Sequence, residues 1–150
     1  MSPKHEKEYA ELSGYVHFFA TVVWGIPLSD PNHPCNSNIA ERYGRSKALQ
    51  GYRQAANDTI EALAGKPVEA LRLLDEGLRK EGLLTFSEVS RRYGRTLKRI
   101  LKRGRLSSET EWYLVTGALA DPSTRLDESD RTTLERASAD FEVAVTSHRR

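Results

Sequence analysis

The sequence contains a single cysteine, Cys35, so an internal disulfide framework is excluded. Its start, Met-Ser-Pro-Lys, lacks the basic and then apolar layout of a secretory signal. The longest apolar run covers only residues 15–28 and contains His17 and Pro27, so it is too short to span a bilayer. We therefore expect a cytoplasmic protein that folds without disulfides and does not enter a membrane.

Motifs of enzymes and metal sites are also missing. The patterns HExxH, GxxxxGK[ST], GxSxG and GxGxxG do not occur. His33 and Cys35, with Asp30 nearby, suggest a metal site or a nucleophile with its base, but one thiol and one imidazole are too few for structural zinc. His17 lies in an apolar stretch and is interpreted as a core histidine. We expect no enzymatic activity, no cofactor and no metal, and rank an enzyme built on the His33 and Cys35 loop third.

What is present is the composition and periodicity of a helical protein. The chain has 150 residues, of which 38% are apolar and 29% charged, which suits one globular domain over residues 1–150. Apolar residues recur at helical spacing in most of the chain outside the proline-rich stretch 25–38. We predict an all-α, single compact domain of about six to seven short-to-medium helices, over residues 3–24, 38–63, 67–81, 86–93, 97–103, 109–120 and from 127 onward.

Local signals mark where these helices begin and end. Thr85 and Ser108 each precede a glutamate by three residues, which is the capping-box spacing, and Ser2 is followed by proline. Asn38 and Thr96 are expected to cap helices in the same way. Within residues 38–63, a glycine at position 44 or 51 is expected to break the helix.

Charge is distributed unevenly along the chain. Residues 72–105 carry eleven Lys or Arg and four Asp or Glu, a local charge of +7, although the net charge of the chain is only +2. Residues 106–145 carry three basic and nine acidic residues, a local charge of −6. The basic segment can attract an acidic partner. Alternatively, the two segments pack together and neutralise each other, and the sequence leaves both possibilities open.

Two short stretches of the sequence resemble each other. Residues 39–46 and 89–96 agree in residue type at seven of eight positions, and both contain Arg-Tyr-Gly-Arg. Each is expected to form the end of a short helix, a glycine stop and a hydroxyl residue that can cap the next helix. A duplicated helical hairpin and a coincidental reuse of the same helix break both explain the similarity.

The second of these stretches resembles the helix-turn-helix motif of DNA-binding proteins. Residues 86–93, the turn near Gly94 and residues 97–103 follow its order of a short helix, a turn and a second helix that carries basic side chains. The resemblance implies that Val89 and Ile100 are core positions and that Ser90 is the small residue where the helices cross.

The favoured functional hypothesis is a non-enzymatic binding protein whose basic helical segment, about residues 91–105, engages an acidic partner, with nucleic acid first. Basic side chains suit phosphate because each contact releases condensed counterions, and few aromatic residues are available for single-stranded binding. The candidate residues are Arg91, Arg92, Arg95, Lys98, Arg99, Lys102, Arg103 and Arg105.

The alternative hypothesis is a protein–protein inhibitor, antitoxin or immunity-type module that uses the acidic C-terminal third. An acidic surface of this kind can cover a basic surface of a protein partner, and an exposed aromatic residue would anchor it. The residues of this hypothesis are Trp112, Tyr113, Asp127, Glu128, Asp130 and Glu135.

Overall fold

The structure of the protein is a computed structural model that describes residues 1–121, 124 and 126–148. These residues form eight α-helices and one short 3-10 helix, and no strand occurs among them. In chain order the elements are α1 (Pro3–Val22), η1 (Pro34–Asn36), α2 (Ile39–Tyr43), α3 (Arg45–Ala62), α4 (Val68–Lys80), α5 (Phe86–Tyr93), α6 (Thr96–Arg103), α7 (Glu109–Ala120) and α8 (Glu128–His148). The all-α prediction is confirmed. None of the helices in the described part of the chain is long and apolar enough to cross a membrane.

Several helices begin at the predicted caps. The hydroxyl groups of Ser2, Thr85 and Ser108 each accept a hydrogen bond from the backbone N–H three residues later. The prediction for Thr96 is wrong, because this residue is already the first of α6 and Arg95 precedes it without a side-chain cap bond. Asn38 likewise precedes α2 without a side-chain cap bond.

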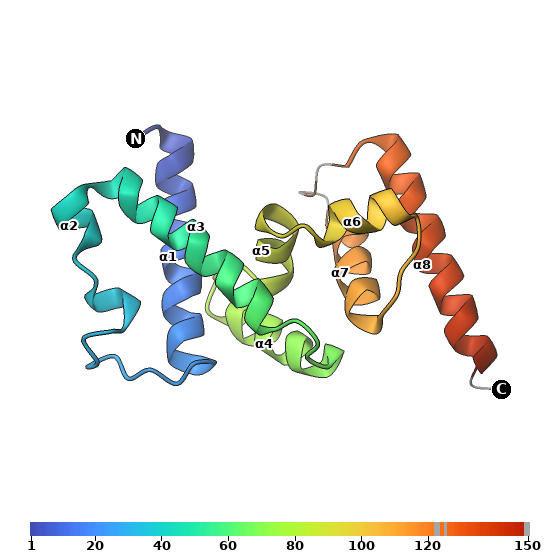
Figure 1. The fold of residues 1–150 in the computed structure, drawn as a ribbon, viewed down its shortest axis with the longest axis horizontal. Helices are drawn as coiled ribbons and strands as arrows, with labels where there is room; N and C mark the ends of the chain where they lie inside the picture. Colours follow the sequence, from blue (N-terminus) through green and yellow to red (C-terminus); the bar gives the residue numbers. More distant parts are fainter. Residues whose placement is uncertain (122–123, 125, 149–150) are drawn as a thin grey trace.

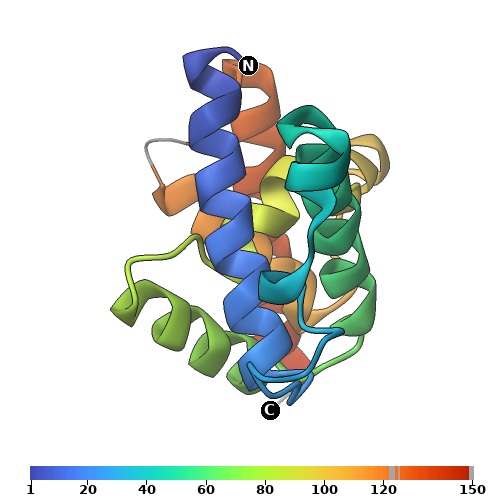
Figure 2. The same ribbon diagram turned by 90° about the vertical axis from the view of Figure 1, so that its left-hand side faces the viewer.

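The buried apolar side chains form two clusters, and α7 contributes to both. The first cluster joins α1, α3, α4 and α5, and α7 adds Leu114 to it. The second cluster joins α6, α7 and α8, and the next residue of α7, Val115, belongs to it. Figure 1 shows α1 to α5 on the left and α6 to α8 on the right, while Figure 2 shows α3 and α4 on opposite sides of α1. The basic helix α6 is therefore held by the second cluster.

The two similar stretches of sequence have different turns. Gly44 separates α2 from α3 with φ of +90°, which a residue with a side chain rarely adopts. Gly94 separates α5 from α6 with φ of −85°, and it is required for another reason: a Cβ there would lie 2.6 Å from the carbonyl oxygen of Ser90. The similarity in sequence is thus not a similarity in geometry, which gives no support to a duplicated hairpin. Gly51, the other predicted break, lies inside α3.

Candidate nucleic-acid interface

The turn between α5 and α6 has the order of elements expected from the sequence, but its two helices are held by different clusters. Val89 and Ile100 are both fully buried, and Ser90, the residue expected where the helices cross, is buried as well. Val89 packs in the first cluster, whereas Ile100 packs in the second. The predicted core positions therefore do not meet in one core as the helix-turn-helix resemblance implies.

Helix α6 is amphipathic, with a buried apolar side and an exposed basic side. Ile100 is fully buried in the second cluster, and Leu97 and Leu101 pack against it half-buried. At 100° per residue, Lys98, Arg99 and Lys102 fall opposite this apolar stripe, and all three side chains are exposed. None of the three forms an ion pair with a described acidic residue.

Two further arginines extend this exposed basic side at the ends of α6. Arg95 directly precedes the helix and Arg105 follows it, and both are exposed. Neither has a carboxylate partner among the residues that the structure describes. We call the five residues of this surface the basic face: Arg95, Lys98, Arg99, Lys102 and Arg105.

The two arginines of α5 that the sequence assigned to the interface are held by carboxylates instead. The side chain of Arg91 is only 8% exposed and forms ion pairs with Glu88 and, at 2.8 Å, with Asp121 at the end of α7. Arg92 is more exposed, but its Nε donates to Glu88 at 2.7 Å and its Nη1 lies 3.5 Å from Glu11 of α1. Arg91 and Arg92 therefore tie α5 to neighbouring helices and lie outside the basic face.

Arg103 is also committed within the protein. Its guanidinium donates to Glu111 of α7 at 2.5 Å and to the carbonyl oxygen of Arg105 at 3.0 Å. The same Glu111 oxygen accepts hydrogen bonds from the backbone N–H and the hydroxyl group of Ser107. This network fixes the connection between α6 and α7, so we leave Arg103 out of the basic face.

The acidic C-terminal segment does not neutralise the basic face by contact. Between residues 72–105 and 106–145, the described ion pairs are those of Arg91 with Asp121 and of Arg103 with Glu111. Helix α6 meets α8 through apolar residues, since Ile100 and Leu134 share the second cluster. The charged sides of the two helices consequently point away from their common core.

The two aromatic residues of the alternative hypothesis are half-buried and hydrogen-bonded. Trp112 donates its Nε1 hydrogen to Glu142 at 3.0 Å, and Tyr113 donates its hydroxyl hydrogen to the buried Asp75 at 2.7 Å. Burial, together with the hydrogen bond to Asp75, raises the pKa of Tyr113 to about 12. Both side chains are therefore committed to hydrogen bonds within the protein, and neither is fully exposed.

Three of the acidic residues in that hypothesis lie where a helix begins. The carboxylate of Asp127 accepts a hydrogen bond of 2.7 Å from the backbone N–H of Asp130, and Glu128 is the first residue of α8. Acidic residues at a helix N-terminus are favoured by the helix dipole. Glu135 is exposed further along α8. Helix formation therefore accounts for Asp127, Glu128 and Asp130 without a partner.

The histidines near the proline-rich loop also have structural roles. His33 is buried, its Nδ1 accepts from the backbone N–H of Cys35 at 3.0 Å, and its Nε2 lies 2.8 Å from the hydroxyl oxygen of Thr21. His17 is hydrogen-bonded to Tyr52, and burial together with His33 lowers the pKa of its imidazole. The described residues contain no group of three or more side chains that could hold a metal ion.

The basic segment, uniform in sequence, is divided in the structure into a paired part and a free part. The pairing of Arg91 and Arg92 with Glu88 has the i,i+3 and i,i+4 spacing of helical ion pairs, so this part was visible in the sequence. The contact of Arg91 with Asp121 spans thirty residues and had no local signal.

Comparisons with protein-family models, with curated proteins and with solved structures gave no match.

Proposed function

We propose that this protein is a non-enzymatic nucleic-acid-binding protein that contacts phosphate groups with the basic face of α6. The observation that carries the proposal is the basic face itself: five exposed cations, with no acidic partner in the described chain, opposite a buried apolar stripe. A cytoplasmic setting belongs to the same proposal, because the single cysteine is an exposed free thiol.

The chemistry of the basic face suits the phosphate backbone better than the bases. Helix α6 contains neither Asn nor Gln, the side chains that pair with adenine, and it contains no aromatic residue on which a base could stack. Lysine and arginine contacts with phosphate gain free energy from counterion release, which depends on charge density and not on base sequence. Duplex or structured nucleic acid, bound with little sequence preference, is therefore the expected partner.

The alternative function, a protein-interaction module on the acidic C-terminal third, receives less support. Trp112 and Tyr113 are engaged with Glu142 and Asp75, and the acidic residues at the start of α8 serve helix formation. A basic protein partner would contact mainly exposed carboxylates, whose interactions are weak at physiological salt.

Fluorescence anisotropy tests the proposal directly. The protein is titrated into labelled duplex DNA, single-stranded DNA and hairpin RNA at low and near-physiological salt. We expect binding to duplex DNA or hairpin RNA that weakens steeply with salt and is abolished in the double variant Arg99→Glu/Lys102→Glu.

A matched control separates the basic face from overall charge. The variant Lys4→Glu/Lys47→Glu changes the net charge by the same amount at exposed residues in the first turns of α1 and α3, which lie on the left in Figure 1, away from α6. Acidic residues are favourable in a first turn, so this variant should fold. Equal weakening by both variants, or no binding of any probe at low salt, would show that the proposal is wrong.

A further inference from the structure

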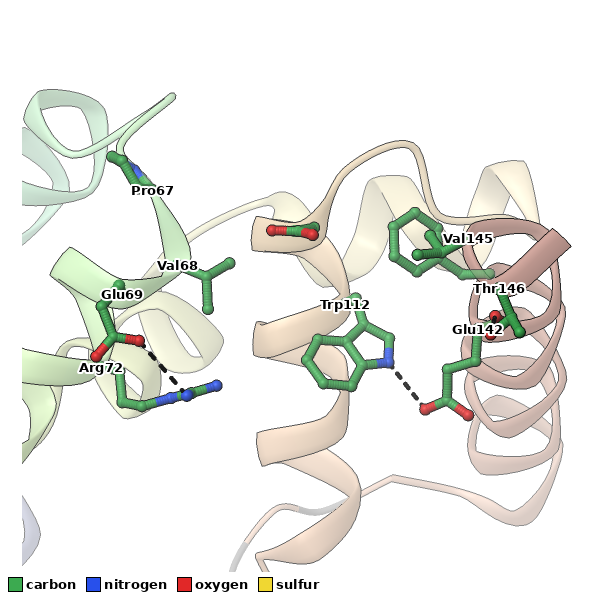
Figure 3. A pocket seen from close by; sticks show the side chains of 10 residues that line it. Pro67, Val68, Glu69, Arg72, Trp112, Glu142, Val145 and Thr146 are labelled. Carbon is green, nitrogen blue, oxygen red and sulfur yellow. Dashed lines mark hydrogen bonds and ion pairs between the residues drawn. The ribbon is translucent and has the colours of Figure 1, made fainter. Parts of the chain in front are cut away.

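An apolar groove of about 500 Å³ lies between α4, α7 and α8, away from the basic face. Its apolar lining includes Val68 from α4, Trp112 from α7, and Phe141 and Val145 from α8. Figure 3 shows the indole of Trp112 between Val68 on one side and Glu142 on the other. These four side chains are only half-buried, so part of each remains open to a ligand. A groove of this volume fits a small molecule.

The charged residues that line the groove are mainly acidic. Glu69, Glu109 and Glu142 face a single cation, Arg72, whose guanidinium is paired with Glu69 at 3.6 Å. Glu109 and Glu142 have no cationic partner among the described residues. The groove therefore combines an apolar floor with two uncompensated negative charges.

Helix formation explains only one of these two carboxylates. Glu109 is the first residue of α7, where the helix dipole favours a negative charge. Glu142 lies in the C-terminal part of α8, far from the N-terminus of that helix, and its Oε1 accepts the Nε1 hydrogen of Trp112. A carboxylate that accepts the indole hydrogen increases the electron density of the ring, which strengthens the attraction of the ring face for a cation.

We propose that this groove binds a small aliphatic polycation, a linear alkyldiammonium ion of the polyamine class. Its methylene chain lies against Val68 and Val145, where apolar contact excludes water. One ammonium group lies at the face of Trp112 beside Glu142, and the other pairs with Glu109. The two uncompensated carboxylates and the apolar residues that line the same groove match the two charged ends and the apolar middle of such an ion.

Tryptophan fluorescence reports on this site when Trp112 is the only indole. Trp24, the other tryptophan, lies just beyond the end of α1 and packs edge-on against Phe19, so a Trp24→Phe background removes its signal with little change in size. The probes are putrescine and spermidine, with neutral butanediol and magnesium chloride at matched ionic strength as controls. We expect a saturable change with both amines and none with either control.

The variant Glu142→Gln tests the assigned carboxylate without removing the hydrogen bond to the indole, because the amide oxygen of Gln can accept it. We expect affinity for putrescine to fall by about tenfold or more, as for the loss of one charge-assisted contact. Glu135→Gln, an exposed residue of the same helix outside the groove, is the matched control and should leave the affinity unchanged. Urea unfolding of each variant confirms that it is folded.

Three results would overturn the inference. One is the absence of a saturable response to either amine at millimolar concentration. Another is an equal loss of affinity in Glu135→Gln and Glu142→Gln, which would mean general attraction to an acidic surface. The third is binding of a tetralysine peptide without binding of putrescine or spermidine, which would assign the groove to a protein partner. None of these results bears on the basic face, which shares no residue with the groove.

Discussion

Replacing Arg99 and Lys102 with glutamine should reduce the salt dependence of nucleic-acid binding by an amount that can be calculated. Each phosphate neutralised on B-form DNA contributes about −0.9 to the slope of log K against log salt concentration, so two lost contacts change the slope by about 1.8. Over a roughly fourfold rise in salt, the factor by which the affinity falls should be about 12 times larger for the wild-type protein than for the variant. Both side chains are exposed and form no ion pair with a described residue, so the free energy of unfolding should change by less than about 0.5 kcal/mol.

Arg91→Gln should leave the salt dependence of binding unchanged and lower the free energy of unfolding. Arg91 is inaccessible to phosphate, so the salt slope of binding should stay at the wild-type value. Removing its guanidinium deprives Glu88 and Asp121 of this cation, although Glu88 keeps its ion pair with Arg92, so the free energy of unfolding should fall by about 1.5–3 kcal/mol. Anisotropy titrations across a salt series and urea denaturation measure the two quantities on the same samples.

The two variants together can refute the assignment of the basic face. If Arg91→Gln, under conditions where it is folded, lowers the salt slope as much as Arg99→Gln/Lys102→Gln, phosphate contacts are not confined to the exposed residues of α6. An unchanged slope in Arg99→Gln/Lys102→Gln would exclude these two side chains from phosphate contact. In either case the division of the segment into a paired and a free part would have no functional meaning.

The remaining predictions concern stability. Gly51→Ala should raise the free energy of unfolding by about 0.5–1 kcal/mol, because the residue lies inside α3 and an added Cβ meets no atom within 4 Å. Gly94→Ala should lower it by about 1–3 kcal/mol, because its Cβ would overlap the carbonyl oxygen of Ser90; urea denaturation compares the two. Arg53→Gln should cost about 1 kcal/mol at neutral pH, since the hydrogen bonds from Arg53 lower the pKa of Glu8. A lowered carboxyl pKa stabilises the fold above the unfolded-state pKa, so the cost of Arg53→Gln should vanish as the pH falls through the lowered pKa of Glu8. Equal costs at neutral pH and at a pH below that pKa would contradict this prediction.

The starts of the helices could be predicted because capping is a local interaction. Ser2, Thr85 and Ser108 each bond to a backbone N–H only three residues away, so the necessary information lies within four consecutive residues. The apolar side of α6 was predictable for the same reason, since the spacing of Leu97, Ile100 and Leu101 specifies one side of a helix. The cluster that this side joins depends on the path of the whole chain and was not predictable.

The two Arg-Tyr-Gly-Arg stretches show how tertiary contacts override a local pattern. Tyr93 donates a hydrogen bond of 2.5 Å to Glu8 of α1, and the glycine after it has φ of −85°. Tyr43 is 66% exposed, and the glycine after it has φ of +90°. The same four residues therefore take two backbone conformations. In the turn between α5 and α6, the conformation is accompanied by the hydrogen bond from Tyr93 to Glu8, which lies 85 positions earlier in the chain. This is also why a resemblance in sequence could not establish a shared hairpin.

The opposite charges of residues 72–105 and 106–145 suggested mutual neutralisation, but helix packing works against it. Two amphipathic helices that bury their apolar sides together must carry their charged sides on the outside, and α6 and α8 meet through Ile100 and Leu134. With axes about 8–10 Å apart and helices about 10–12 Å wide, the outward charged sides lie roughly 20 Å from each other. This separation is about two and a half Debye lengths at physiological salt, so the acidic side of α8 only weakly neutralises the basic face. A phosphate in direct contact with α6 meets Lys98, Arg99 and Lys102 at a few ångströms, and this difference in distance is what leaves the basic face able to bind.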